Sequence, residues 1–194
     1  MLEMPNLDVH ALTADRWDDL ELLFGPTGAY SGCWCMFLRE SAKSFATNCR
    51  SGGGANKALL RAIVDRGEVP GLLGYRNGAP VGWVSVSPRS QYERVLRSPV
   101  HKPIDSETGV WSIACFFIHK SARRTGFADA LLAAAVQYAK AEGARLLEAY
   151  PIDSGGAALP AADMWRGSLD QFLRAGFAVA ACRKPARPIV RRRL

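Results

Sequence analysis

The sequence predicts an α/β fold, namely a single domain whose mixed central sheet contains an antiparallel hairpin and a parallel βαβ unit. Its 194 residues, of which 48% are hydrophobic, suit one globular core. Two strand-like segments, 72–76 and 81–86, flank Asn77-Gly78, a pair that accepts the positive φ angles of a type I′ hairpin turn. Residues 110–118 form an apolar run of strand length, and a helical pattern and a second run at 146–150 follow it. Parallel strands need such a crossover helix, which completes the βαβ unit.

The other expected elements follow in chain order and leave no boundary for a second domain. A first strand at 7–12 precedes Thr13, a suitable N-cap for a helix that runs to Phe24. A helical region at 39–66 is interrupted by the glycine-rich joint at 51–54. The remaining elements are a short helix at 91–96, a helix at 164–175 that ends at Gly176, and strands at 177–182 and 189–192. We therefore expect residues 1–194 to form one domain.

Positive charge is concentrated at one end of the chain. Of the 25 basic side chains six lie in residues 183–194, and the rest of the chain, with nineteen basic and 18 acidic side chains, is nearly neutral. This short basic C-terminal segment is expected to be a solvated tail. Contact with nucleic acid or an acidic partner is the alternative.

The chain is expected to lie in the cytoplasm and to have no membrane partner. No apolar run approaches the roughly 18 residues of a membrane span, and the N-terminal residues lack the apolar core of a signal peptide. In that compartment the five cysteines are expected to be reduced thiols.

The segment between the 110–118 run and the following helix has the features of a phosphate-binding turn. The first backbone N–H groups of a helix lack partners within the helix, and the helix dipole favours an anion there. Gly126 and Ala128 lack bulk where a ligand approaches the main chain, while Arg123 and Arg124 add positive charge. The sequence therefore predicts a site for a pyrophosphate.

The spacing Arg123-x-x-Gly126-x-Ala128 resembles the Q/R-x-x-G-x-G/A signature of the GNAT N-acetyltransferase superfamily. The expected order of strands and helices is also similar to that superfamily over nearly the whole chain. Ala175-Gly176-Phe177 resembles its A/L-G-F motif, and the segments 32–36, 82–89 and 148–151 look like those of a little-characterised bacterial branch.

The resemblance implies an enzyme that moves an acetyl group from acetyl-coenzyme A to a primary amine by direct attack on the thioester. The acceptor is expected to be a small molecule or a protein, and a homodimer is left open. Main-chain groups of Phe116, Phe117 and Ile118 are implied to bind the pantetheine arm and polarise the thioester. The residues implied to hold the pyrophosphate are Arg123, Arg124, Thr125, Gly126, Phe127 and Ala128.

Two departures from the family pattern leave the acid and base unassigned. Phe172 stands where many members carry a tyrosine that acts as the general acid. Ser112 stands where some members carry a glutamate that acts as the general base. Glu148 and Tyr150 are the expected replacements, because strand alternation places both on one face next to the proposed thioester. A salt-bridged carboxylate and a core aromatic residue are the alternatives. His119 lies on the other face, where a surface or phosphate contact is expected.

The group Cys33-Trp34-Cys35 admits several interpretations. A zinc site lacks enough partners, and no metal is expected. A covalent acyl carrier at Cys35 needs a depressed pKa and a neighbouring base. We expect Trp34, Cys35 and Trp83 to line the acceptor pocket, with burial of both tryptophans in the core as the alternative.

Two functions of other classes remain beside the enzyme. One is a non-catalytic sensor of the same fold that binds acyl-coenzyme A. The other is a nucleic-acid-associated protein that uses the arginine-rich tail, which is expected to show a steep salt dependence.

Overall fold

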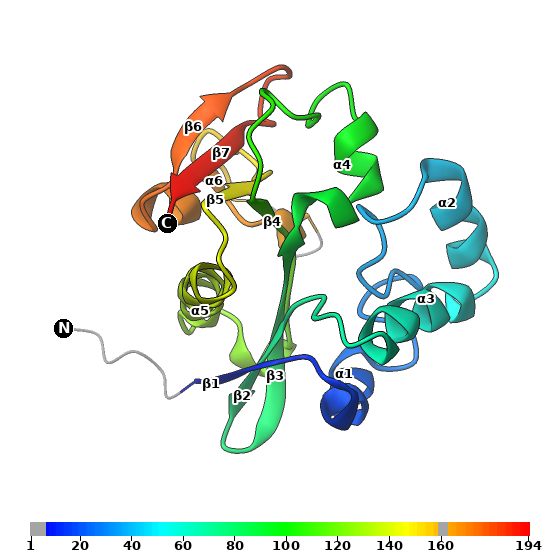
Figure 1. Ribbon diagram of the computed structural model, residues 1–194. Helices are drawn as coiled ribbons and strands as arrows, with labels where there is room; N and C mark the ends of the chain where they lie inside the picture. Colours follow the sequence, from blue (N-terminus) through cyan, green and yellow to red (C-terminus); the bar gives the residue numbers. More distant parts are fainter. Residues whose placement is uncertain (1–6, 159–162) are drawn as a thin grey trace.

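The computed structural model describes residues 7–158 and 163–194, which form one mixed sheet and the helices around it (Figure 1). The sheet has seven strands in the order β1-β2-β3-β4-β5-β7-β6. The strands are β1 (Asp8–Ala11), β2 (Leu72–Arg76), β3 (Ala79–Pro88), β4 (Val110–Ile118), β5 (Leu146–Ala149), β6 (Ala178–Ala181) and β7 (Ile189–Arg193). The α-helices are α1 (Trp17–Phe24), α2 (Ala42–Arg50), α3 (Gly54–Asp65), α4 (Glu93–Arg97), α5 (Phe127–Ala141) and α6 (Leu169–Arg174). Four 3-10 turns complete the set: η1 (Ala14–Arg16), η2 (Arg89–Gln91), η3 (Lys120–Ala122) and η4 (Met164–Arg166).

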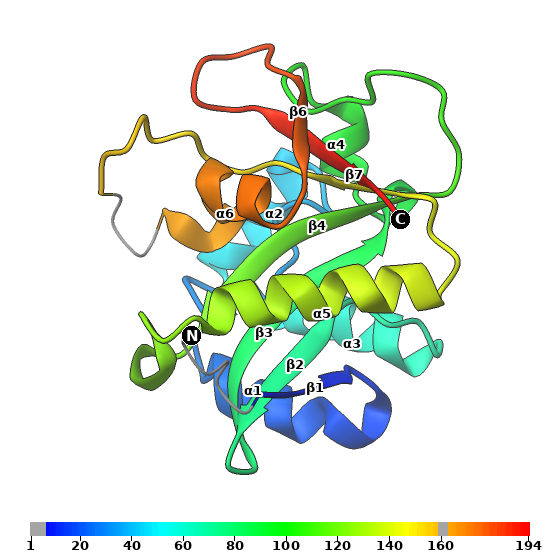
Figure 2. The ribbon, with the colours of Figure 1, turned by 90° about the vertical axis from the view of Figure 1, so that its left-hand side faces the viewer.

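Helices cover both faces of the sheet. The long helix α5 lies across one face, and α1, α2 and α3 lie on the opposite side (Figures 1 and 2). On the α5 face the apolar residues of that helix, among them Leu131 and Ala135, pack against Val84 and Phe116 of the sheet. On the other face Leu20 of α1 packs in a separate cluster with Trp83. Burial of these two faces supplies the main driving force for the fold.

The hairpin and the βαβ unit are confirmed. Asn77 and Gly78, which join β2 to β3, have φ angles of 52° and 74°, the positive values that a type I′ turn requires. Strands β4 and β5 are parallel, and α5 crosses between them. This helix ends where Gly143 takes a left-handed conformation and the amide of Ala144 donates to the carbonyl of Ala139 at 2.9 Å, as in a Schellman cap.

The helix expected at 164–175 is interrupted. Gly167 adopts φ 75° and ψ 164°, which separates the short turn η4 from α6. The Ser168 hydroxyl then caps α6 by accepting from the amide of Gln171 at 3.2 Å. The apolar pattern runs through Gly167, but a φ of 75° cannot belong to a right-handed helix.

The basic C-terminal segment is not a solvated tail. Residues Ile189–Arg193 of this segment form strand β7, which lies between β5 and β6 and pairs with both in antiparallel register. Ile189 and Val190 are fully buried in the sheet. Within the described residues, no helix is long and apolar enough to cross a membrane.

Candidate functional site

The turn between β4 and α5 presents a row of unpaired backbone donors. Gly126, the residue before the first residue of α5, has φ 80° and ψ 1°, and Arg124 also has a positive φ of 61°. In the part of the chain that the structure describes, the amides of residues 123–128 have no hydrogen-bond acceptor in the protein. This arrangement can bind the oxygens of a pyrophosphate.

Local contacts fix the turn in this conformation. The Thr125 hydroxyl donates to the carbonyl of Ala122 at 2.7 Å, and Nε of Arg123 donates to the carbonyl of Ile118 at 3.1 Å. Ala122 and Phe127 are buried against Val81 beneath the turn. The donors are therefore held in place before any ligand arrives, which reduces the entropy lost on binding.

The predicted phosphate residues lie together at this turn. Phe127 is buried, whereas Arg123, Arg124, Thr125 and Gly126 are exposed and Ala128 is partly buried. His119 begins the turn, and its Nδ1 lies 2.8 Å from the Ser121 hydroxyl.

Strands β4 and β5 separate beyond their first four paired residues. Their pairing ends at Ile113 and Ala149, and a bulge in the pairing of β3 with β4 leaves Ala114 without a partner in β3. Among the described residues, the remaining length of β4, which includes Phe116 and Ile118, pairs with β3 alone.

Backbone alternation shows which groups of β4 face this gap. The amide of His119 donates to the carbonyl of Val81 at 2.9 Å, so the backbone groups of His119 and Phe117 point toward β3. Those of Phe116 and Ile118 point the other way, toward the gap. Phe117 therefore offers no free main-chain group there, and its side chain instead packs against Phe24 with ring centroids 5.7 Å apart.

Glu148 and Tyr150 lie on one face, as predicted, but both are engaged. The Tyr150 hydroxyl donates to Oε1 of Glu148 at 2.7 Å and lies 2.9 Å from the Ser112 hydroxyl. Oε2 of Glu148 accepts from Arg89 at 3.2 Å and from Nε of Arg191 at 2.8 Å. These are the surroundings of the alternative interpretation, a salt-bridged carboxylate beside the sheet, and proton transfer by either residue stays a prediction.

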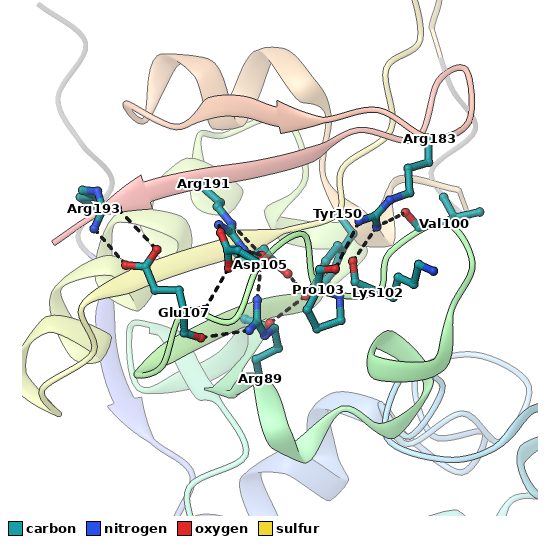
Figure 3. A network of polar contacts seen from close by, with 12 residues as sticks. Arg89, Val100, Lys102, Pro103, Asp105, Glu107, Tyr150, Arg183, Arg191 and Arg193 are labelled. Carbon is teal, nitrogen blue, oxygen red and sulfur yellow. Dashed lines mark hydrogen bonds and ion pairs between the residues drawn. The ribbon is translucent and has the colours of Figure 1, made fainter.

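Arginines of the C-terminal segment hold the loop at residues 98–109 against the sheet (Figure 3). Arg183 donates to the carbonyls of Val100, Lys102 and Pro103 at 2.6 to 3.3 Å. Arg191 pairs with Asp105 as well as Glu148, and Arg193 pairs with Glu107. The charge that suggested a nucleic-acid partner is thus largely used inside the fold.

Trp34, Cys35 and Trp83 come together in the apolar cluster on the α1 side of the sheet. All three are buried, and the Trp83 indole donates to Sγ of Cys35 at 3.2 Å. A hydrogen bond from the Cys115 thiol, and a second one from Trp83, lower the pKa of Cys35 against the effect of burial. Trp34 also borders an open surface groove beside Lys57, whose Nζ lies 5.2 Å from the indole centroid. Trp83 is fully buried, which matches the core alternative.

No group of three or more metal-ligating side chains is brought together among the described residues. Cys33 and Cys35 therefore have no zinc ligand set within residues 7–158 and 163–194.

His101 and Arg166 lie beside the gap, and the sequence gives no indication of this placement. The His101 ring is buried, with its centroid 5.2 Å from that of Tyr150, and its Nε2 has no partner among the described residues. Burial, followed by the charges of Arg166, Arg187 and Arg183, lowers the pKa of His101 to about 4. Its loop has no periodic pattern, so the sequence carries no signal for this placement.

Acid should destabilise the fold through His101. In the unfolded chain this imidazole takes up a proton near its ordinary pKa of 6.5, whereas in the fold it stays neutral down to about pH 4. The titration of His101 therefore takes nothing from the free energy of unfolding above about pH 6.5. It lowers this free energy by an amount on the order of 2 kcal/mol as the pH drops toward 4. Urea unfolding of the wild type and of His101→Gln at about pH 7 and pH 4.5 measures this. An equal loss in both proteins would contradict it.

Comparison with known proteins places the chain in a family. A family model described as "Acetyltransferase (GNAT) family" matches residues 37–162. The search of curated proteins gives no match.

Solved structures share the fold at low sequence identity. A GNAT-family acetyltransferase from Listeria monocytogenes is 12% identical with a TM-score of 0.59, over 100% of this chain and 98% of that one. PaiA N-acetyltransferase from Thermoplasma acidophilum, in complex with coenzyme A, is 11% identical with a TM-score of 0.55, over 97% and 99%. A ribosomal-protein-alanine N-acetyltransferase from Brucella melitensis is 16% identical with a TM-score of 0.53, over 96% and 99%. With the family model spanning well over half of its residues, this chain belongs to the GNAT acetyltransferase family.

Proposed function

We propose that this protein transfers an acetyl group from acetyl-coenzyme A to a primary amine by direct attack of the amine on the thioester. The observation that carries the proposal is the set of unpaired amides at residues 123–128, fixed at the end of a strand that has separated from its parallel neighbour.

The residues of the turn fit a coenzyme with a pyrophosphate. The amides of Arg124, Thr125, Gly126, Phe127 and Ala128 supply donors, and the side chains of Arg123 and Arg124 supply positive charge. Neither arginine takes part in an ion pair within the described residues.

The free backbone groups of β4 are suited to the acyl end. Acetyl-coenzyme A, when bound, supplies an acetyl group activated as a thioester. We assign the amides of Phe116 and Ile118 to binding and polarising groups in the gap, because a fixed backbone donor stabilises developing negative charge without reorganisation. Phe172 is buried without a hydroxyl, so the family's usual acidic group is lacking at that position.

The acceptor must lose a proton before or during attack. An alkylammonium with a pKa of about 10.4 is mostly protonated at neutral pH. Since both oxygens of Glu148 already accept strong hydrogen bonds, we assign Glu148 and Tyr150 to holding β4, β5 and β7 together where the strands separate. The proton then passes to water, and orientation of the two substrates supplies much of the rate.

A second candidate is a sensor that binds acyl-coenzyme A without turnover. The specific observation that favours it is the engagement of Glu148 and Tyr150, together with the phenylalanine at 172.

A thiol-release assay separates the two candidates. The purified protein is offered acetyl-coenzyme A with polyamines, aminoglycosides, amino acids and peptide amines, and N-acetyl product is identified by mass spectrometry. The enzyme should release free coenzyme A in proportion to product. Tight binding by calorimetry with no release for any amine would support the sensor, and absence of binding would overturn both.

A further inference from the structure

Arg166 is fixed beside the gap between β4 and β5. It ends η4, and the carbonyl of the following Gly167 accepts a hydrogen bond of 3.0 Å from the amide of Ile152, just beyond β5. A Cβ at Gly167 would meet the rings of Phe172 at 2.9 Å and Phe116 at 3.5 Å, so the backbone is packed closely against β4. The η4 turn that carries Arg166 therefore lies against β4.

The guanidinium of Arg166 lies over aromatic rings, and one of its nitrogen atoms is buried without an acceptor among the described residues. Its Cζ lies 4.3 Å from the ring centroid of Trp165 and 5.9 Å from that of Phe37. The NH1 atom is buried and has no hydrogen-bond partner among the described residues. A buried guanidinium N–H without an acceptor is unfavourable, and such a group in a cleft calls for an oxygen ligand.

The neighbouring charges are also positive. Burial, followed by the charge of Arg187 and further on that of Arg94, lowers the pKa of Arg166 to about 10. The carboxylate of Glu148 pairs with Arg89 and Arg191, not with Arg166. Glu40 lies near Arg94 rather than near Arg166. No ion pair among the described residues includes Arg166 or Arg187.

We propose that Arg166, supported by Arg187, binds an oxyanion group of the acceptor, so that the natural substrate is an amine that also carries a carboxylate or a phosphate. This inference rests on the proposed acetyl transfer. The planar guanidinium matches either anion through paired N–H donors. Cys115 is among the groups whose charge acts on Arg166. The stretch of β4 from Cys115 to Ile118 spans roughly 10 Å of extended strand. Arg166 is thus separated from the phosphate turn by the length over which a pantetheine arm would lie.

The test compares matched amines that differ only in the anionic group. Lysine is paired with cadaverine, tyrosine with tyramine, and phosphoethanolamine with ethanolamine. We expect one anionic member to exceed its partner in kcat/KM by about tenfold or more, as a charge-assisted hydrogen bond would give. In Arg166→Gln this ratio should fall toward one, while the coenzyme A Kd stays within about twofold. Arg97→Gln, which changes an exposed arginine on α4, is the matched control.

The outcomes separate the two proposals. Equal use of both members of every pair, or a ratio that persists in Arg166→Gln, overturns the anion site and leaves acetyl transfer standing. If coenzyme A binds but no amine is acetylated, transfer fails, and calorimetry with N-acetyllysine, N-acetyltyrosine and phosphate then decides the anion site. Binding that is lost in Arg166→Gln supports it, and no binding or unchanged binding overturns it.

Preference for the amino acids over phosphoethanolamine identifies a carboxylate, and the reverse identifies a phosphate.

Discussion

Gly126→Glu should abolish binding of coenzyme A, with Kd raised by more than about hundredfold. A glutamate at φ 80° is strained, and its carboxylate is placed where unpaired amides at residues 123–128 await an anion. The new side chain therefore competes for the same donors and repels the pyrophosphate. Isothermal titration with coenzyme A measures the loss directly, without any acceptor.

Gly143→Glu is the matched control for this variant. Gly143 follows the other end of α5 with the same φ of 80°, and a Cβ there meets nothing within 4 Å. Each substitution should destabilise the fold by about 1–2 kcal/mol through the left-handed backbone. Only the change at Gly126 should affect coenzyme binding. If both variants bound coenzyme A like the wild type, the phosphate turn would be assigned wrongly.

Glu148→Ala should lower the free energy of unfolding by about 3–5 kcal/mol. The substitution leaves two guanidinium groups, those of Arg89 and Arg191, without their shared carboxylate at a site where Glu148 has no exposed surface. It also removes the acceptor of the Tyr150 hydroxyl. Against a total stability of about 5–15 kcal/mol, this loss is a large fraction of the free energy of unfolding. Urea unfolding followed by circular dichroism gives the value.

Two comparisons show whether burial is the cause. Glu148→Gln keeps an acceptor oxygen and the side-chain volume, so its loss should be smaller than that of Glu148→Ala. Glu93→Gln breaks the exposed pair with Arg97 and should change stability by less than about 1 kcal/mol. A Glu148→Ala protein as stable as Glu93→Gln would show that the buried network does not hold the sheet together.

The network around Glu148 links the folding of the chain to its site. Arg191 lies on β7 and Arg89 follows β3, so a single carboxylate on β5 connects strands that come from distant parts of the sequence. The same cluster reaches the 98–109 loop through Asp105. We expect weakening of this cluster to change the positions of His101 and Arg166, beside the gap between β4 and β5, more than the conformation of the turn at residues 123–128.

The features that the sequence determined are local. The Asn77-Gly78 turn, the left-handed turn at Gly126 before α5 and the end of α5 at Gly143 each depend on the conformation of a few consecutive residues. Continuous apolar runs of strand length likewise predicted β4 and β5, and the helical spacing of apolar residues predicted α5.

The tertiary structure decided which charged groups meet. The composition of residues 183–194 predicts a solvated basic tail. In the fold, pairing of β7 with β5 brings Arg191 into contact with Glu148, 43 positions earlier in the sequence. The isolation of Arg166 and the burial of His101 depend in the same way on segments far away in the chain. Ion pairing and desolvation depend on distances in space. Composition and spacing along the chain therefore do not predict them, because they are decided only when the strands pack together.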